Sequence, residues 1–206
     1  LIECDVSDDE SIKSSFKSLK EKWSSFDGFV HSIGYAPSDQ LEGDFLEVTS
    51  REGFKIAHDI SSYSFTAMAK ESKPMLNENS ALLTLTYLGS RQTLPNYNVM
   101  GLAKASLEAN TRFLAASLGK DNIRVNAISA GPMKTLAGAA IGGARRVFRL
   151  SEQNSPLGSH PNLMSVGGAA AFLLSDFGMH TSGEVLFVDG GYHVMGMPKL
   201  DHIEKV

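Results

Sequence analysis

Tyr97 and Lys104 are the two residues of this sequence best suited to acid–base chemistry. They lie seven positions apart, which is about two turns of an α-helix, so both side chains can lie on one helical face. In that arrangement a phenol can act as an acid or hydrogen-bond donor beside an ammonium group. The pair also follows an apolar segment, 81–87, that has the pattern of a buried strand. We therefore expect the pair just beyond a strand, at the start of a helix.

Tyr63 and Lys70 have the same spacing and serve as an internal comparison. They lie inside a long segment with a helical pattern, 51–75, among apolar residues. A buried ring with a solvated lysine is the better interpretation there. Position directly after a strand therefore distinguishes Tyr97 and Lys104 from the second pair.

The elements that would position these residues follow an α/β pattern. Apolar runs alternate with helical patterns, which is typical of a parallel sheet covered by helices. We predict an α/β, Rossmann-like, doubly wound parallel sheet with helices on both faces, forming one domain over residues 1–206. Ser7 and Glu10 form a capping box that opens the first expected helix, and Ile12, Phe16, Leu19 and Trp23 form its buried stripe. The expected strands are 1–6, 27–34, 81–87, 123–128 and 184–188, and the further expected helices are 51–75, 99–118, 135–150 and 166–175.

Composition limits the classes of function. The chain has 206 residues, 42% of them hydrophobic, and a net charge of -4. This excludes a disordered chain and gives no general attraction to nucleic acid or to an anionic membrane. A single cysteine, Cys4, excludes an intrachain disulfide, and the six histidines never fall at the i, i+4 spacing of a zinc site, so no metal is expected.

The expected compartment follows from what the sequence lacks. No apolar run approaches the roughly 20 residues needed to span a bilayer, and the first residues do not have the pattern of a signal peptide. We expect a cytoplasmic protein without membrane insertion.

In an open parallel sheet, ligands bind beyond the carboxyl ends of the strands. Polar or glycine-containing segments follow four of the expected strands, at Asp5-Val6, Ser32-Ile33-Gly34, Tyr87 and 131–135. Each of these also has a simpler interpretation when taken alone. Asp5 could precede a helix cap, Gly34 could be a turn glycine, and Tyr87 could be an ordinary strand aromatic.

Taken together, several motifs resemble a known family. They are His31-Ser32-Ile33-Gly34, Tyr87-Leu88-Gly89, the run 97–105 (YNVMGLAKA), the run 126–132 (NAISAGP) and Val188-Asp189-Gly190-Gly191. Over nearly the whole chain they resemble bacterial enoyl-[acyl-carrier-protein] reductase, a divergent short-chain dehydrogenase/reductase. Ordinary members of that superfamily place three residues between the active Tyr and Lys, whereas the enoyl reductases and this chain place six. The resemblance implies reduction of the carbon–carbon double bond of trans-2-enoyl-[acyl-carrier-protein] with NADH, the final reductive step of fatty-acid elongation.

The resemblance also implies roles for individual residues. Tyr97 would stabilise the enolate that forms during reduction, Lys104 would hold the nicotinamide ribose, and Tyr87 would line the acyl pocket with a possible second role in proton handling. Substrate would contact Ala36, Tyr87 and Tyr97. The NADH-binding residues would be Asp5, Val6, Ile33, Gly34, Lys104, Met133, Lys134, Thr135, Leu136 and Ala137.

Two further features follow from the resemblance. The segment 135–150 matches a helix that covers the acyl chain, although its composition also fits an ordinary surface helix. Arg145, Arg146 and Arg149 cluster on it, which suggests a docking patch for the acidic acyl carrier protein; solvated charges are the alternative. Family members are usually homotetramers, here expected to join through the helices at 51–75 and 99–118.

The chain departs from the family pattern at its start. No glycine-rich turn precedes Asp5, and the sequence opens at Leu1 in an expected strand. We therefore expect an N-terminal portion with the first βα units to be absent. This leaves a catalytically silent fragment or homologue as an alternative. A ketoacyl-type reductase would call for the three-residue Tyr/Lys spacing and a serine near Thr86, and the sequence has neither.

Overall fold

A parallel four-stranded sheet forms the centre of the molecule in a computed structural model that describes residues 1–133 and 144–199. The strands lie side by side in chain order, β1-β2-β3-β4, and β2 and β3 are buried along most of their length. The strands are β1 (Phe26–His31), β2 (Leu76–Thr86), β3 (Arg124–Ala130) and β4 (Val185–Val188), and the helices are α1 (Asp9–Lys20), α2 (Phe45–Val48), α3 (Arg51–His58), α4 (Ser64–Ser72), α5 (Asn98–Leu118), α7 (Ala144–Asn154) and α8 (Leu163–Leu174).

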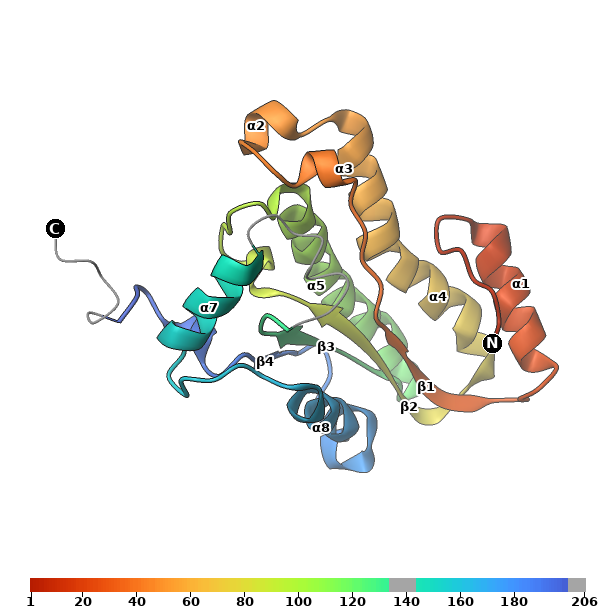
Figure 1. The fold of residues 1–206 in the computed structure, drawn as a ribbon. Helices are drawn as coiled ribbons and strands as arrows, with labels where there is room; N and C mark the ends of the chain where they lie inside the picture. Colours follow the sequence, from red (N-terminus) through yellow and green to blue (C-terminus); the bar gives the residue numbers. More distant parts are fainter. Residues whose placement is uncertain (134–143, 200–206) are drawn as a thin grey trace, which may run out of the picture.

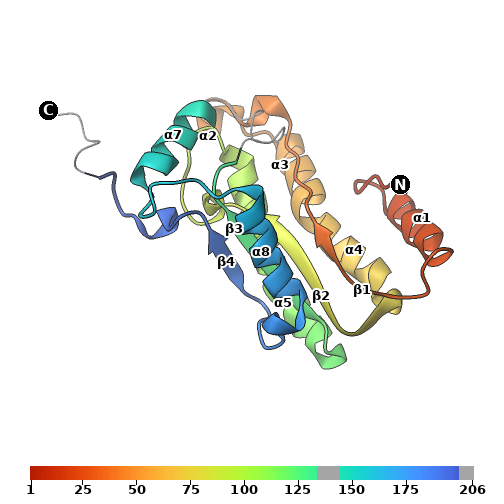
Figure 2. The same ribbon diagram turned by 60° about the horizontal axis from the view of Figure 1, so that its bottom comes forward.

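Helices cover both faces of this sheet (Figures 1 and 2). The helices α4 and α5 lie on one face and α8 lies on the other, while α1 packs against α4. Successive residues of β2 point to opposite faces, so Leu82 enters the core cluster under α4 and α5, and Leu83 enters the cluster under α8. The predicted Rossmann-like α/β fold with helices on both faces is confirmed.

The prediction for the N-terminal segment was wrong in three details. Residues 1–6 form no strand, because none of the four described strands lies beside them to pair with their backbone. The N-cap of α1 is Asp8, whose side chain accepts a hydrogen bond from the Glu10 amide, rather than Ser7. Trp23 lies beyond the end of α1 and is 59% exposed, so the predicted buried stripe stops before it.

The predicted helical segment 51–75 is continuous but not uniform. Between α3 and α4 the backbone forms a π-helix, Asp59–Tyr63, and a 3-10 turn, Lys73–Met75, ends the segment. The Tyr63 side chain is 47% exposed, so the predicted burial of its ring was wrong, while Lys70 is exposed as predicted. A π-turn rotates the faces of a helix relative to the 3.6-residue period on which that prediction depended.

The predicted helix 135–150 lies partly outside the described residues. Its described part belongs to α7, which continues to Asn154. Arg145, Arg146 and Arg149 are exposed on this helix. In the parts of the chain that the structure describes, no helix is long and apolar enough to cross a membrane.

Candidate active site

Tyr97 lies at the N-terminus of α5, where it is only 6% exposed. Its ring meets the Tyr87 ring edge-on, with centroids 5.2 Å apart. Burial raises the pKa of Tyr97 above its ordinary value, because a phenolate would be removed from water, and nearby Tyr87 and Glu108 act in the same direction. The Tyr97 hydroxyl is therefore protonated at neutral pH and available as a hydrogen-bond donor.

Gly89 provides the surface against which the Tyr97 ring packs. A Cβ atom at position 89 would lie 2.3 Å from Tyr97 Cδ1, and one at Gly101 would lie 2.8 Å from the Gly89 carbonyl oxygen. Any larger residue at position 89 would displace the ring. The turn after β2 and the first turn of α5 are thus in direct contact, and this contact fixes the direction of Tyr97.

Lys104 joins the carboxyl ends of two neighbouring strands. Its Nζ donates to the carbonyl oxygens of Leu85, at 2.9 Å, and Ile33, at 3.4 Å. The side chain is 7% exposed, and burial lowers its pKa to about 8, although the negative charge of Glu108 opposes the shift. At pH 7 the ammonium is mostly charged.

The space beside this ammonium fits a sugar diol. A Cβ atom at Gly34 would approach Lys104 Nζ to 3.3 Å, so the glycine leaves one side of the ammonium open. Lys104 has three N–H donors, and no third acceptor appears for it among residues 1–133 and 144–199. The residues present therefore fit the ribose hydroxyls of a nicotinamide dinucleotide.

The other predicted site residues divide into three groups. Tyr87 is half-buried beside Tyr97, and burial, with smaller effects of Tyr192 and Asp189, raises its pKa to about 12. Ala36 packs against a cluster that includes Val99 and Ala103, which lie on α5 between Tyr97 and Lys104 in the sequence. Each of these lies close to the pair.

Met133 packs against the apolar cluster under α8, at the end of β3. Asp5 and Val6 lie in a turn before α1, where the Asp5 carboxylate accepts hydrogen bonds from the amide and hydroxyl of Ser7. The contacts described for these residues do not join them to the Tyr97–Lys104 pair. Lys134, Thr135, Leu136 and Ala137 lie outside the described residues.

Glu108 is a buried residue of this region that the sequence analysis missed. It lies on α5 one turn after Lys104 and is 4% exposed. The i, i+4 spacing from Lys104 was a signal available in the sequence, but such a pair usually lies on the surface of a helix.

His31 links β1 to its neighbours at the edge of the site. Its ring nitrogens are 2.9 Å from Thr84 Oγ1 and 2.8 Å from Ser64 Oγ. Burial, with a smaller effect of the Lys104 charge, lowers the pKa of His31 to about 3, so the ring is neutral in the folded protein.

This burial predicts an acid-dependent loss of stability. Below about pH 6.5 the unfolded chain binds a proton at His31 that the folded chain does not, so stability falls as the pH falls from 6.5 toward 3. Between pH 7.5 and 5.5 the free energy of unfolding of wild type should fall by about 1.4 kcal/mol more than that of His31→Gln. Urea unfolding at the two pH values measures the difference. Equal losses in the two proteins would contradict a neutral buried His31.

Comparison with known proteins identifies the family. The family model described as enoyl-(acyl carrier protein) reductase matches residues 1–193. The NADH-dependent enoyl-[acyl-carrier-protein] reductase FabI of Escherichia coli K12 is 54% identical over 98% of this chain and 77% of the relative. The corresponding FabI of Neisseria meningitidis serogroup B is 50% identical over 93% of this chain and 74% of the relative.

A solved structure agrees with the sequence comparisons. The crystal structure of the enoyl-(acyl-carrier-protein) reductase of Anaplasma phagocytophilum in complex with NAD has a TM-score of 0.92 and 43% identity. It covers 99% of this chain and 75% of that one. With the Tyr97–Lys104 geometry at the strand ends, these matches show that the chain belongs to the enoyl-[acyl-carrier-protein] reductase family.

Proposed function

We propose that this protein reduces the carbon–carbon double bond of trans-2-enoyl-[acyl-carrier-protein] with NADH, in the final reductive step of fatty-acid elongation. The observation that carries the proposal is the buried Tyr97 hydroxyl beside the Lys104 ammonium at the carboxyl ends of β1 and β2. The relatives bear the name of this reaction. Thr86 Oγ1 donates to Glu108, which directs that hydroxyl away from the role of a serine in a ketoacyl-type reductase.

Each residue near the pair has a defined task in this proposal. NADH supplies the reducing electrons when bound. Lys104 holds the ribose hydroxyls in the space that Gly34 leaves open, and Ile33 lies along the same side. Tyr97 donates its hydroxyl proton in a hydrogen bond to the thioester carbonyl oxygen, where negative charge develops, so it stabilises the transition state. Tyr87 and Ala36 line the acyl pocket, and Tyr87 provides a second hydroxyl close to the reacting bond.

The remaining predicted cofactor contacts belong to the same proposal. Asp5 and Val6 would meet the adenine, and the segment 133–137 would meet the nicotinamide and phosphates. Residues 1–206 would act as one domain, in which the segment 135–150 covers the acyl chain. We place the protein in the cytoplasm, the compartment that the family resemblance implies.

Replacing Tyr97 by Phe tests the assigned hydrogen bond. The substitution removes only the hydroxyl, so folding and NADH binding should be unchanged. We expect kcat with a trans-2-enoyl thioester to fall by between about a hundredfold and a thousandfold, since one donor to the developing oxyanion is lost. Steady-state kinetics with the protein expressed from its complete gene measure this change. An unchanged kcat, under conditions where the chemical step limits the rate, would contradict the role of the hydroxyl.

We also propose that the three arginines of α7 receive the acyl carrier protein. Arg145, Arg146 and Arg149 are exposed and lie on one short helix in a chain with a net charge of -4. Reversing all three charges to Glu should raise KM for the carrier-bound substrate by about tenfold or more at low salt. KM for a short thioester without carrier protein should not change, which serves as the control. An unchanged KM for the carrier-bound substrate in the triple variant would contradict a docking patch at these arginines.

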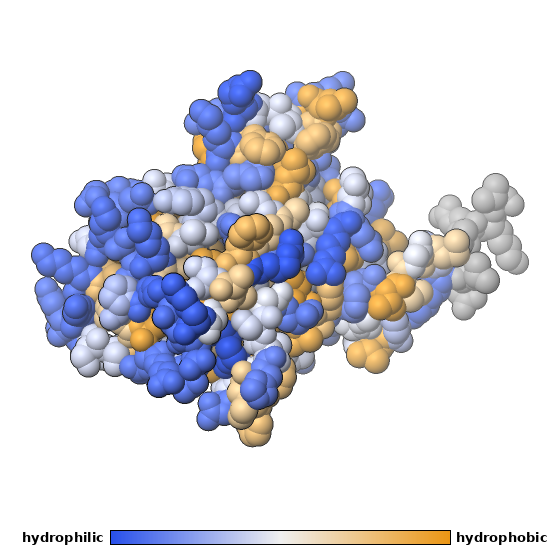
Figure 3. Space-filling view, turned by 180° about the vertical axis from the view of Figure 1, so that it is seen from behind, coloured by the Kyte–Doolittle hydropathy of each residue, from blue (hydrophilic) through white to orange (hydrophobic). Residues whose placement is uncertain are grey.

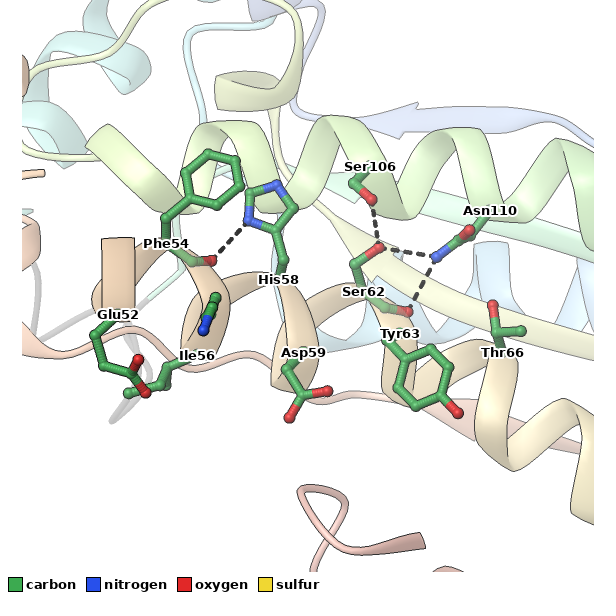
Figure 4. A pocket seen from close by; sticks show the side chains of 11 residues that line it. Glu52, Phe54, Ile56, His58, Asp59, Ser62, Tyr63, Thr66, Ser106 and Asn110 are labelled. Atoms are coloured by element: carbon green, nitrogen blue, oxygen red, sulfur yellow. Dashed lines mark hydrogen bonds between the residues drawn. The ribbon is translucent and has the colours of Figure 1, made fainter. Parts of the chain in front are cut away.

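A homotetramer joined through the long helices is the proposed assembly. An open groove of about 790 Å³ runs along the outer face of α3, the π-helix and α5, away from Tyr97 and Lys104. Figure 4 shows Phe54, His58 and Tyr63 lining it beside Ser106 and Asn110 of α5. Seen from behind the view of Figure 1, the surface of the molecule mixes apolar with hydrophilic residues (Figure 3). Sedimentation equilibrium should give the mass of four chains, and a monomer mass would contradict the assembly.

A further inference from the structure

Glu108 accepts hydrogen bonds from three side chains, one at the end of β2 and two in the turn that follows it. Its carboxylate accepts the Thr86 hydroxyl at 3.0 Å and the Ser90 hydroxyl in a short hydrogen bond. Its other oxygen accepts Arg91 Nε at 3.2 Å. A carboxylate that is 4% exposed is stable only when its lone pairs are satisfied in this way. The three donors come from a single stretch, 86–91, so one residue of α5 fixes the whole turn.

This turn carries the parts that orient the reacting groups. Tyr87 follows Thr86 directly, and its ring meets the ring of Tyr97. Gly89 precedes Ser90 and provides the surface on which Tyr97 packs. A change in the position of the turn would therefore move both phenols. Glu108 itself does not touch either ring in the described contacts.

Glu108 also lies one helical turn from Lys104, and its negative charge favours the ammonium form. This charge opposes the effect of burial, which alone would lower the pKa of Lys104 further. The other titratable groups around Lys104 and Glu108 come from several elements of the fold. His31 faces Lys104 from β1, Tyr87 and Arg91 come from the turn after β2, and α5 contributes Tyr97 and Arg112, whose Nη1 donates to the Glu108 carbonyl oxygen.

We propose that Glu108 is a positioning residue for the reductase reaction. It holds the 86–91 turn, and with it Tyr87 and the surface under Tyr97, in the geometry the reaction requires. It also keeps Lys104 charged when a dinucleotide arrives. The inference rests on the proposed function and adds a residue to it. Glu108 therefore acts in two separable ways, through its side-chain hydrogen bonds to the 86–91 segment and through its negative charge.

Glu108→Gln tests the charge, because the substitution keeps the size of the side chain. The measurement is kcat/KM for NADH between pH 6 and 10, with a trans-2-enoyl thioester at a saturating concentration. This parameter reports ionisations of the free enzyme. In wild type the activity should fall as Lys104 loses its proton near its pKa of about 8. In Glu108→Gln the fall should move about one pH unit lower, and kcat should drop about tenfold.

Two further variants separate the possible causes. Thr86→Val combined with Ser90→Ala removes two hydrogen bonds to Glu108 but keeps the Glu108 carboxylate, so kcat should fall while the pH profile stays unchanged. Thr111→Val is the matched control, because Thr111 is buried on α5 and, among the described residues, its hydroxyl donates only to the Leu107 carbonyl oxygen of its own helix. The control should change neither kcat nor the pH profile.

The outcomes distinguish this inference from the function on which it depends. A wild-type protein that does not oxidise NADH with enoyl thioesters would overturn the function. An active wild type with a folded Glu108→Gln variant of unchanged pH profile and kcat would overturn the role of Glu108. Should Glu108→Gln fail to fold, the double variant decides, and an unchanged kcat there would overturn the positioning of the turn.

Discussion

Replacing Lys104 by Met should lower NADH-dependent turnover about a thousandfold or more while the protein still folds. Methionine fills a similar volume but cannot donate to ribose hydroxyls or place a positive charge beside the developing enolate. The loss should appear both as weaker NADH binding and as a lower kcat. Steady-state kinetics and NADH fluorescence titration measure the two separately. Turnover within tenfold of wild type would contradict the assigned role.

The stability of the same variant follows from the burial of the ammonium. Burial lowers the pKa of Lys104 from 10.5 to about 8, so the buried ammonium destabilises the folded protein at pH 7 by on the order of 3 kcal/mol. Methionine removes this cost but leaves the carbonyls of Leu85 and Ile33 without a donor. The two effects oppose each other, so the net change at pH 7 should be small.

The pH dependence of the free energy of unfolding tests whether the Lys104 ammonium is buried. Between pH 8 and 10.5 the unfolded chain holds a proton at Lys104 that the folded chain has released, so the contribution of this group to stability rises with pH. Lys104→Met should lack that rise. Parallel stability curves for the two proteins across this range would contradict a buried ammonium.

Gly28→Ala should strongly destabilise the fold, although it adds only one methyl group. Gly28 lies in β1 with φ of +146°, and a Cβ there would be 1.9 Å from the Ala81 carbonyl oxygen. The pairing of β1 with β2 is irregular between Phe26 and Gly28. We expect a loss of about 3–5 kcal/mol in the free energy of unfolding, since backbone strain and a clash with the neighbouring strand add.

A second glycine provides the matched control. Gly167 lies on the exposed side of α8, and in the described part of the chain no atom outside its own helical turn lies within 4 Å of the position its Cβ would take. Gly167→Ala should stabilise the protein by up to about 1 kcal/mol, because alanine favours the helix. Urea unfolding of both variants compares them directly. A Gly28→Ala loss below about 1 kcal/mol would show that β1 can shift to accept the methyl group.

Much of the fold could be predicted from the sequence because buried parallel strands leave a strong signal. The apolar runs around Leu82, Val125 and Leu186 each mark a strand, and the alternating helical patterns imply helices on both faces. Tyr97 and Lys104 could be paired from spacing and position after a strand. The structure places both at the ends of β1 and β2.

Other features depend on long-range contacts that local patterns do not encode. Residues 1–6 have the composition of a strand, but a strand exists only where a neighbour pairs with it. The π-helix at Asp59–Tyr63 changes which side chains face outward, and no helical period predicts it. Glu108 resembles a surface residue until the turn after β2 is placed against it. These are interactions between segments that lie far apart in the chain.

The most direct measurement is NADH oxidation by the protein expressed from its complete gene, with the acyl product analysed by mass spectrometry. With trans-2-enoyl-[acyl-carrier-protein] we predict NADH consumption and a product two hydrogens heavier, the saturated acyl chain, in equal amounts. With a 3-ketoacyl substrate we predict neither. Reduction of the ketoacyl substrate, or no NADH consumption with any enoyl thioester, would contradict the enoyl reductase activity assigned to Tyr97 and Lys104.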